Sequence, residues 1–322
     1  MTVELNDIKV SIVIVCMNNV DKLCVCLDSI HATTRCRYEL LLVAYLFSPE
    51  NLRIIREQYP WVTIIESNEI RGFSENNNLA LRQARGKYCF VVNDDTEMPD
   101  AVIDRLIESM EKQPDAAIMS PVLYFPTGAV QYCGRPYKGA WQYMRELIGA
   151  YNETRAASPY VNQRGVFQSY NIVGAAFLIK TDVFRRLGWF DERYFFCPED
   201  IALSTKANKE GYKAFVDADV KLIHYHCGTS SKVKRATFPA EIRGELMFMS
   251  GGNPLRYAML GIYAFGVMTL KLGGLLALYL LRPQNRQEYR INILSKYNTL
   301  KSIFTTKTPK EIFTRYYSNI KR

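Results

Sequence analysis

The sequence predicts an α/β fold with a mixed, mainly parallel sheet, followed by a helical C-terminal tail. Three observations lead to this prediction. Between residues 10 and 96, short β-branched or aliphatic runs alternate with helix-like stretches, which is the pattern of a doubly wound sheet. Polar residues follow these runs at their carboxyl ends. Finally, residues 257–281 are almost wholly apolar and lead into a basic segment.

The first part of the chain supplies the alternation. Its apolar runs have the length and composition of strands that are buried on both faces. Strands are expected at 10–16, 38–44, 62–66 and 88–92, and helices at 21–31, at 49–58 and from the Asn76 triplet to Ala84, before Gly86. Ligands of such sheets bind beyond the carboxyl ends of the strands, where Asn18, Asn68 and Asp94 fall.

The later part of the chain is less regular. Strands are expected at 118–124, 174–179 and 220–223, helices at 100–110, 182–187 and 200–210, and a hairpin or loop at 128–134. Residues 137–168 lack clear periodicity and are rich in aromatic and basic side chains. They are expected to form either a loop that shapes a pocket or an irregular surface excursion.

A pair of carboxylates closes the strand at 88–92, in the sequence Asn93-Asp94-Asp95. Adjacent carboxylates at the edge of a core repel each other unless a cation or several donors neutralise them. Mg²⁺ and Mn²⁺ prefer oxygen ligands and often bind one or two carboxylates together with substrate phosphates. The stretch therefore suggests a metal–diphosphate site, and the alternative is a turn that caps the helix after Pro99.

A second acidic pair, Glu199-Asp200, opens the predicted helix at 200–210. Acids in a first helical turn are also explained by the helix dipole alone. Two of the three histidines, His224 and His226, follow the last predicted strand. With Cys197 and Cys227 they could bind zinc, but their spacing fits no familiar finger or ribbon.

Composition limits the classes of function. The chain is 48% hydrophobic and 23% charged, as expected of a globular protein. Its eight cysteines are scattered without a C-x-x-C pair, which favours reduced thiols in the cytosol, and the acidic residues near Met1 argue against a secretory signal. Of the net charge of +9, residues 282–322 carry +8, so the folded body is not a basic nucleic-acid-binding domain. The absence of G-x-G-x-x-G and Walker motifs also weakens the dehydrogenase and P-loop alternatives.

Taken together, the motifs resemble those of the family 2 glycosyltransferases with the glycosyltransferase-A (nucleotide-diphospho-sugar transferase) fold, particularly bacterial rhamnosyltransferase-like enzymes that build surface polysaccharides. The resemblance covers roughly residues 10–235 and rests on the order of several short motifs. These are the first strand with Asn18, the block Asn68/Gly72-Phe73/Asn77-Asn78, Asn93-Asp94-Asp95-Thr96, Gly174-Ala175-Ala176, Gly188/Phe190-Asp191-Glu192, Glu199-Asp200 and His226-x-Gly228-x-Ser230.

The resemblance implies a role for each matching residue. Asp95 and His226 would be ligands of a divalent metal, Mg²⁺ or Mn²⁺, and Asp94 would face the nucleotide ribose. Glu199-Asp200 would supply the general base, with Asp200 the first choice. The donor, a nucleotide-diphosphate sugar, would also contact Asn18, Asn68, Gly72, Asn77 and Asn93, and Asp191 and Glu192 would lie on the side of the glycan or lipid-linked acceptor. One base and in-line attack imply inversion at the anomeric carbon.

One position departs from the family pattern. The family usually has an aspartate at the end of the second strand to recognise the nucleobase, and here the run is Val43-Ala44-Tyr45. Either Tyr45 stacks on the base, or the donor differs from the usual one, or binding is lost. An inactive membrane-tethered nucleotide-sugar or glycan-binding module is therefore one alternative. A nucleotidyltransferase is another, although it would be expected to carry a glycine-rich activating loop.

The apolar segment 257–281 contains one charge, Lys271, and as a helix would be about 37 Å long, enough to cross a membrane. Both of its flanks are basic and favour the cytoplasmic side. We therefore expect a catalytic domain at 1–235 and a C-terminal part at 236–322 that lies in the inner leaflet or re-enters near 271–274. The basic tail would contact anionic lipids on the cytoplasmic face of the cell membrane. A packed dimerisation helix is the alternative.

Overall fold

The computed structural model describes residues 8–132, 134–152, 160–226, 233–318 and 320. The chain forms two compact units, one of residues 1–137, 153–191 and 200–227 and the other of residues 138–152, 192–199 and 228–322. Each unit thus consists of several separate segments of the chain, so no single residue marks the boundary between them. The predicted domain boundary at 235 stays a prediction.

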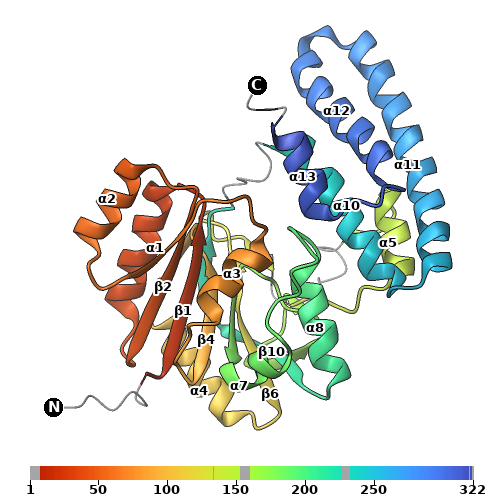
Figure 1. Cartoon of the computed structure of the whole chain (residues 1–322). Helices are drawn as coiled ribbons and strands as arrows, with labels where there is room; N and C mark the ends of the chain where they lie inside the picture. Colours follow the sequence, from red (N-terminus) through yellow and green to blue (C-terminus); the bar gives the residue numbers. More distant parts are fainter. Residues whose placement is uncertain (1–7, 133, 153–159, 227–232, 319, 321–322) are drawn as a thin grey trace. The chain divides into compact units, whose positions relative to one another are not determined.

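The first unit is built on one mixed sheet (Figure 1). Its strands are β1 (Val10–Cys16), β2 (Tyr38–Tyr45), β3 (Thr63–Ser67), β4 (Tyr88–Asn93), β5 (Thr96–Glu97), β6 (Ala116–Tyr124), β7 (Val130–Tyr132), β8 (Val166–Ser169), β9 (Ala176–Lys180) and β10 (Lys213–His224). The order is β3-β2-β1-β4-β9-β6-β10-β5, with β7 on β6 and β8 on β10. The first four strands are mutually parallel, whereas β9 is antiparallel to both β4 and β6. This confirms the mixed, mainly parallel sheet.

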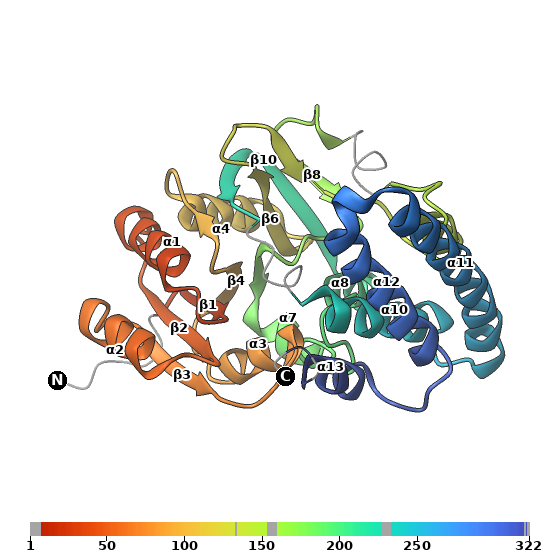
Figure 2. The same cartoon turned by 90° about the horizontal axis from the view of Figure 1, so that it is seen from above.

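Helices cover both faces of the sheet, as Figure 2 shows. One core, containing Ile12 and Ile14, includes buried side chains of α1 (Val20–Thr33), α2 (Pro49–Gln58) and α4 (Val102–Lys112). The other core, containing Val13, includes side chains of α3 (Phe73–Leu81), α7 (Thr181–Arg186) and α8 (Glu199–Lys209). Burial on both sides explains why the strands are continuous apolar runs.

Several elements differ from those expected from the sequence, among them two elements within residues 137–168 and one helix end. Residues 137–168 contain helix α5 (Ala140–Leu147) and strand β8, so the expected irregular excursion is wrong. Only Tyr143 and Leu147 are buried on α5, and a single i, i+4 pair is too short to stand out as periodicity. Helix α3 ends at Leu81 because the next bonds, such as that from the Ala84 N–H to the Leu81 carbonyl, span three residues.

The second unit is helical. It contains α5, α10 (Lys234–Ser250), α11 (Pro254–Leu281), the 3₁₀ turn η2 (Pro283–Asn285), α12 (Arg286–Ser302) and α13 (Pro309–Ser318). Leu246, Ala264 and Ile303 are among the residues of its core. The basic tail is therefore folded largely into α12 and α13.

Helix α11 runs without a break through 271–274, so the expected re-entrant turn is wrong. Pro254 begins the helix, and Asn253 caps it by accepting from the Arg256 N–H at 2.9 Å. In the described part of the chain it is the one helix long and apolar enough to cross a membrane, with a mean hydropathy of 1.8. Its most apolar window is only 11% buried, and Leu270 and Leu280 are 79% and 71% exposed.

The sheet has a tight backbone contact at Gly86. A Cβ atom built there would lie 2.5 Å from the Ser11 nitrogen and 2.7 Å from the Val10 carbonyl carbon. Backbone atoms cannot retreat as a flexible side chain can. We therefore expect Gly86→Ala to destabilise the protein by about 1–3 kcal/mol or more, which thermal unfolding would measure.

Gly273→Ala is the matched control, because nothing lies within 4 Å of the added atom on α11 and alanine favours a helix. Its melting temperature should stay the same or rise slightly. Equal melting temperatures for the two variants would contradict the backbone contact.

Candidate active site

The parallel register places several polar strand ends along one edge of the sheet. Cys16 at the end of β1 is paired with Ala44, Ala44 is paired with Glu66 of β3, and Val15 is paired with Asn93 of β4. The residues after these positions therefore emerge side by side. Asn18, Asn68, Asp94 and Asp95, all predicted as site residues, are among them.

Asn18 links two of the loops at this edge. Its φ of +55° is in the left-handed region, which asparagine tolerates better than most residues. Its Oδ1 accepts from the Ser48 N–H and from the Asn51 side-chain amide, both at 2.9 Å. The β1–α1 turn is thereby tied to the start of α2.

Tyr45 holds the next loop. It is only 6% exposed, and its hydroxyl accepts from the Arg71 N–H at 3.3 Å. The ring thus offers almost no surface on which a nucleobase could stack, so the expectation that Tyr45 stacks on the base is wrong. Either the donor differs from the usual one or donor binding is lost. Asn68 is exposed after β3, and Gly72 is the N-cap of α3, where its N–H donates to the Glu75 carboxylate at 3.1 Å.

Two buried asparagines on α3 have different partners. Asn77 donates to the carbonyl of Phe73 in its own helix at 2.9 Å. Asn78 donates to the Phe190 carbonyl at 2.9 Å and accepts from the Phe190 N–H at 3.1 Å. It therefore fixes the backbone just before Asp191. In the sequence, Asn78 stood out only as part of the Asn77-Asn78 motif.

Asp94 and Asp95 form the predicted carboxylate pair. Burial and the neighbouring Asp95 charge raise the pKa of Asp94 to about 6, and the interaction with the Cys16 thiol offsets part of this rise. Asp95 is 8% exposed. The pair is thus kept in a partly desolvated place where a nearby cation would lower its energy.

A histidine lies against this pair. The Nε2 atom of His224 is 3.2 Å from Oδ1 of Asp95, and its Nδ1 atom is 2.6 Å from Oε1 of Gln131. When Nδ1 carries the proton and donates to Gln131, the lone pair of Nε2 faces the carboxylate. Two acceptors in contact need a proton or a cation between them, and a ring N–H held by an oxygen is typical of metal-binding histidines.

His226, the histidine that the sequence favoured, is exposed and has a φ of +52°. Its ring is perpendicular to that of His224, with 5.5 Å between the centroids. The resemblance gave no role to His224, which the sequence offered only as part of the zinc alternative. Gly228 and Ser230 of the same motif, and Cys227 of the zinc alternative, lie outside the described residues.

The donor set fits a divalent metal that is completed by its substrate. Within the described residues, no three His, Cys, Asp or Glu side chains gather in a way that could hold an ion. Asp95 and His224 provide one carboxylate and one imidazole, and Mg²⁺ typically takes one or two carboxylates together with substrate phosphates. The zinc alternative, which needs four protein ligands in a structural site, gains no support from this arrangement.

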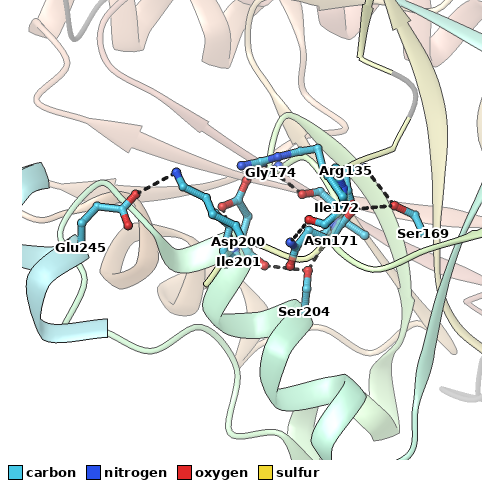
Figure 3. A network of polar contacts seen from close by, with 11 residues as sticks. Arg135, Ser169, Asn171, Ile172, Gly174, Asp200, Ile201, Ser204 and Glu245 are labelled. Carbon is cyan, nitrogen blue, oxygen red and sulfur yellow. Dashed lines mark hydrogen bonds and ion pairs between the residues drawn. The ribbon is translucent and has the colours of Figure 1, made fainter. Parts of the chain in front are cut away.

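The second acidic group is anchored by a buried arginine, as Figure 3 shows. Nη1 of Arg135 donates to Oδ2 of Asp200 at 2.7 Å, and the two side chains are 9% and 14% exposed. The same Oδ2 accepts from the Gly174 N–H at 3.1 Å, and Oδ1 accepts from the Ile201 N–H at 2.7 Å. Arg135 lies in a loop that matches none of the sequence motifs.

The Gly174 contact brings Asp200 to the same edge of the sheet as Asp94. Gly174 precedes β9, where Ala176 is paired with Val92 of β4, and the Ala175 carbonyl accepts from the Asn93 N–H at 2.9 Å. Asp191 also belongs to the first unit, whereas Glu192 and Glu199 belong to the second. Glu199 is 8% exposed and Glu192 is exposed.

The amino-acid sequence is similar to a family model and to proteins of known name. The family model described as Glycosyl transferase family 2 matches residues 11–187. The chain is 27% identical over 221 residues to the O-antigen biosynthesis protein RfbC of Myxococcus xanthus, covering 67% of this chain and 17% of that protein. It is 22% identical over 188 residues to the N-acetylglucosaminyl-diphospho-decaprenol L-rhamnosyltransferase of Mycobacterium tuberculosis, covering 55% of this chain and 61% of that protein. The chain therefore spans less than two thirds of either relative.

The fold of this chain resembles the folds of solved structures. GalNAc-T7 with UDP, GalNAc and Mn²⁺ matches with a TM-score of 0.54 and 16% identity, over 68% of this chain and 44% of that one. The mannosyltransferase PcManGT of Pyrobaculum calidifontis, in complex with GDP-Man and Mn²⁺, matches with a TM-score of 0.52 and 17% identity, over 92% and 85%. The fold is thus the glycosyltransferase-A fold predicted from the sequence. Because the family model also covers more than half of its length, the chain belongs to glycosyl transferase family 2.

Proposed function

We propose that the protein is an inverting, metal-dependent glycosyltransferase that moves a sugar from a nucleotide-diphosphate donor to a hydroxyl of a glycan or lipid-linked acceptor in cell-surface polysaccharide synthesis. The observation that carries this proposal is the contact between Asp95 and His224 beside Asp94 at the end of β4. The names of the two relatives, an O-antigen biosynthesis protein and a rhamnosyltransferase, support the class of reaction.

The donor would bind along the carboxyl edge of β1 to β4. Asp94 would accept from a ribose hydroxyl, and the loops of Asn18, Asn68 and Gly72 would surround the nucleotide, with Asn93 beside Asp94. Asn77 stays a predicted donor residue, although its amide bonds its own helix. Because Ala44 replaces the usual aspartate, the nucleobase lacks its usual carboxylate partner. The proposal therefore does not specify the base of the donor nucleotide.

Asp95 would hold the metal together with His224, His226 or both. When bound, a divalent ion supplies positive charge to the leaving diphosphate. The contribution of this chain is to hold one carboxylate and one imidazole close together, with Gln131 fixing the orientation of the His224 ring.

The acidic pair Glu199-Asp200 would supply the general base, which removes the proton of the acceptor hydroxyl as the new bond forms. Asp200 is placed at the sheet edge, but in the described structure its carboxylate accepts from Arg135, Gly174 and Ile201. These bonds support Asp200 as a well-oriented group, and a substrate hydroxyl would have to share one of its oxygens. They also favour the second candidate function, a binding module without turnover.

The protein would bind its acceptor at the cytoplasmic face of the cell membrane. Asp191 and Glu192 are the predicted acceptor-side residues, and Asn78 holds the backbone before them. The exposed leucines of α11 and the basic residues after it support membrane association. A helix that packs against a second copy of the chain would use the same apolar surface.

The metal and base assignments predict different losses. Asp95→Ala should abolish metal-dependent binding of UDP or GDP, because it removes the carboxylate ligand. Asp200→Ala should keep that binding and lower sugar-nucleotide turnover by about 10² to 10⁴. Thermal shift with Mn²⁺ and a panel of sugar nucleotides measures the first, since a ligand of the folded state raises the melting temperature, and release of nucleoside diphosphate measures the second.

Two single variants, His224→Ala and His226→Ala, show which histidine acts with Asp95. The proximity of His224 to Asp95 predicts the larger loss of metal affinity for His224→Ala. Turnover that survives both Asp95→Ala and Asp200→Ala would refute the proposed function.

The buried Arg135–Asp200 ion pair leads to a separate prediction about the free energy of unfolding. Arg135→Met leaves a buried carboxylate without its cation, which should cost about 3–5 kcal/mol. Arg135→Met combined with Asp200→Asn removes both charges and should recover part of that loss. Urea unfolding of the two single variants and the double variant measures the coupling, and strict additivity would show that the pair contributes nothing.

Membrane association can be tested with α11 itself. The wild-type chain should stay with membranes in high salt and leave them only in detergent, because apolar contacts are not screened. Leu270→Glu should move the protein toward the soluble fraction, while Trp141→Glu, which is also exposed at 65% but lies on α5, should not. Release of the wild-type chain by salt alone would contradict an embedded α11.

A further inference from the structure

The helical unit contains a cavity of about 260 Å³ that is separate from the residues described above. It lies where α10, α12 and α13 meet. Arg235 from α10, Lys301 from α12 and Arg315 from α13 line it, together with the polar side chains of Asn298 and Tyr316. Three cations from three helices therefore converge on one small space.

No acid lines this cavity among the described residues. Glu311, one turn before Arg315, accepts instead from the N–H and the hydroxyl of Thr308, at 2.7 and 2.9 Å. Within the described residues, Lys301 is placed over the Tyr297 ring at 4.3 Å and Arg315 near the Tyr316 ring at 5.7 Å. Like charges gathered without a carboxylate raise the local potential and attract anions.

Hydrogen bonds fix the walls of the cavity. The Asn298 amide donates to the Arg235 carbonyl at 3.0 Å, which joins α12 to the start of α10. The Tyr316 hydroxyl donates to the Asn298 carbonyl at 3.3 Å, which joins α13 to α12. Tyr316 is also only 8% exposed. The three cations are thus carried by a framework that is formed before any ligand binds, which reduces the entropy lost on binding.

We propose that this cavity is a binding site for a phosphate- or diphosphate-bearing ligand. Arginine and lysine form charge-assisted hydrogen bonds with phosphate oxygens, and arginine can do so through two N–H groups. A cavity of about 260 Å³ is smaller than the roughly 300–1,000 Å³ of drug-sized sites, which favours a compact anion over a whole nucleotide. The ligand is either a phospholipid headgroup or the diphosphate of a soluble or isoprenoid-linked compound.

Lining the cavity distinguishes Lys301 and Arg315 from other basic side chains of residues 282–322. Arg282, Arg286 and Arg290 are exposed side chains and do not line the cavity. The site is also independent of the proposed sugar transfer, because it uses neither Asp95 nor a metal. A failure of one proposal therefore leaves the other standing.

Calorimetric titration of the full chain with inorganic pyrophosphate, at low ionic strength and with EDTA present, tests the site. We expect binding that weakens by tenfold or more in Arg315→Gln and in Arg235→Gln, since each removes a charge-assisted contact. Lys301→Gln, at an exposed side chain, provides a third variant should either arginine variant fail to fold. Arg290→Gln is the matched control on α12, and Asp95→Ala excludes the donor site; both should bind as the wild type does.

Three results would overturn the proposal: no binding of pyrophosphate, equal weakening by Arg290→Gln, or loss of binding in Asp95→Ala. Vesicles then distinguish the two sources of phosphate. If Arg315→Gln weakens binding to phosphatidylglycerol vesicles more than Arg290→Gln does, the ligand is a lipid headgroup. If the two variants bind vesicles equally while pyrophosphate binding still depends on Arg315, the ligand is a soluble or isoprenoid-linked diphosphate.

Discussion

The adjacent charges of Asp94 and Asp95 are the constraint on which the rest of the candidate site depends. Asp94 has a pKa of about 6 in the folded chain against an ordinary value of 3.8. The folded state therefore holds this proton more tightly than the unfolded chain. Ionisation as the pH rises from about 4 to about 6 costs stability, and the full cost is present above the folded pKa. A carboxylate kept at such a cost near neutral pH is more typical of a functional site than of a core.

The surroundings of the pair hold its geometry. Asn18, Tyr45 and Asn78 each bond to the backbone of a loop distant in sequence, so the strand ends are joined to one another by side chains. His224 contacts the Asp95 carboxylate through Nε2, and its other ring nitrogen faces Gln131. The edge of the sheet is thus pre-formed, and an incoming cation would find its ligands already oriented.

The sequence predicted what depends on local patterns. The strands β1 to β4 were placed within two residues of their bounds, because runs that are buried on both faces can be recognised from composition alone. Helix α5 was missed because its contacts are made through only two buried positions. The roles of Arg135 and His224 could not be predicted for another reason, since these depend on partners 65 and 129 residues away that only the fold brings near.

The two acidic groups show how environment separates side chains of the same type. Asp94 is buried next to a like charge, and both conditions raise its pKa. Asp200 accepts from a guanidinium and two backbone N–H groups, which together fix the orientation of its carboxylate. A carboxylate beside another negative charge gains most from a bound cation, whereas one beside an arginine does not need a metal. In the proposed function, the metal is therefore assigned to the Asp94–Asp95 edge, and Asp200 would orient or deprotonate the acceptor.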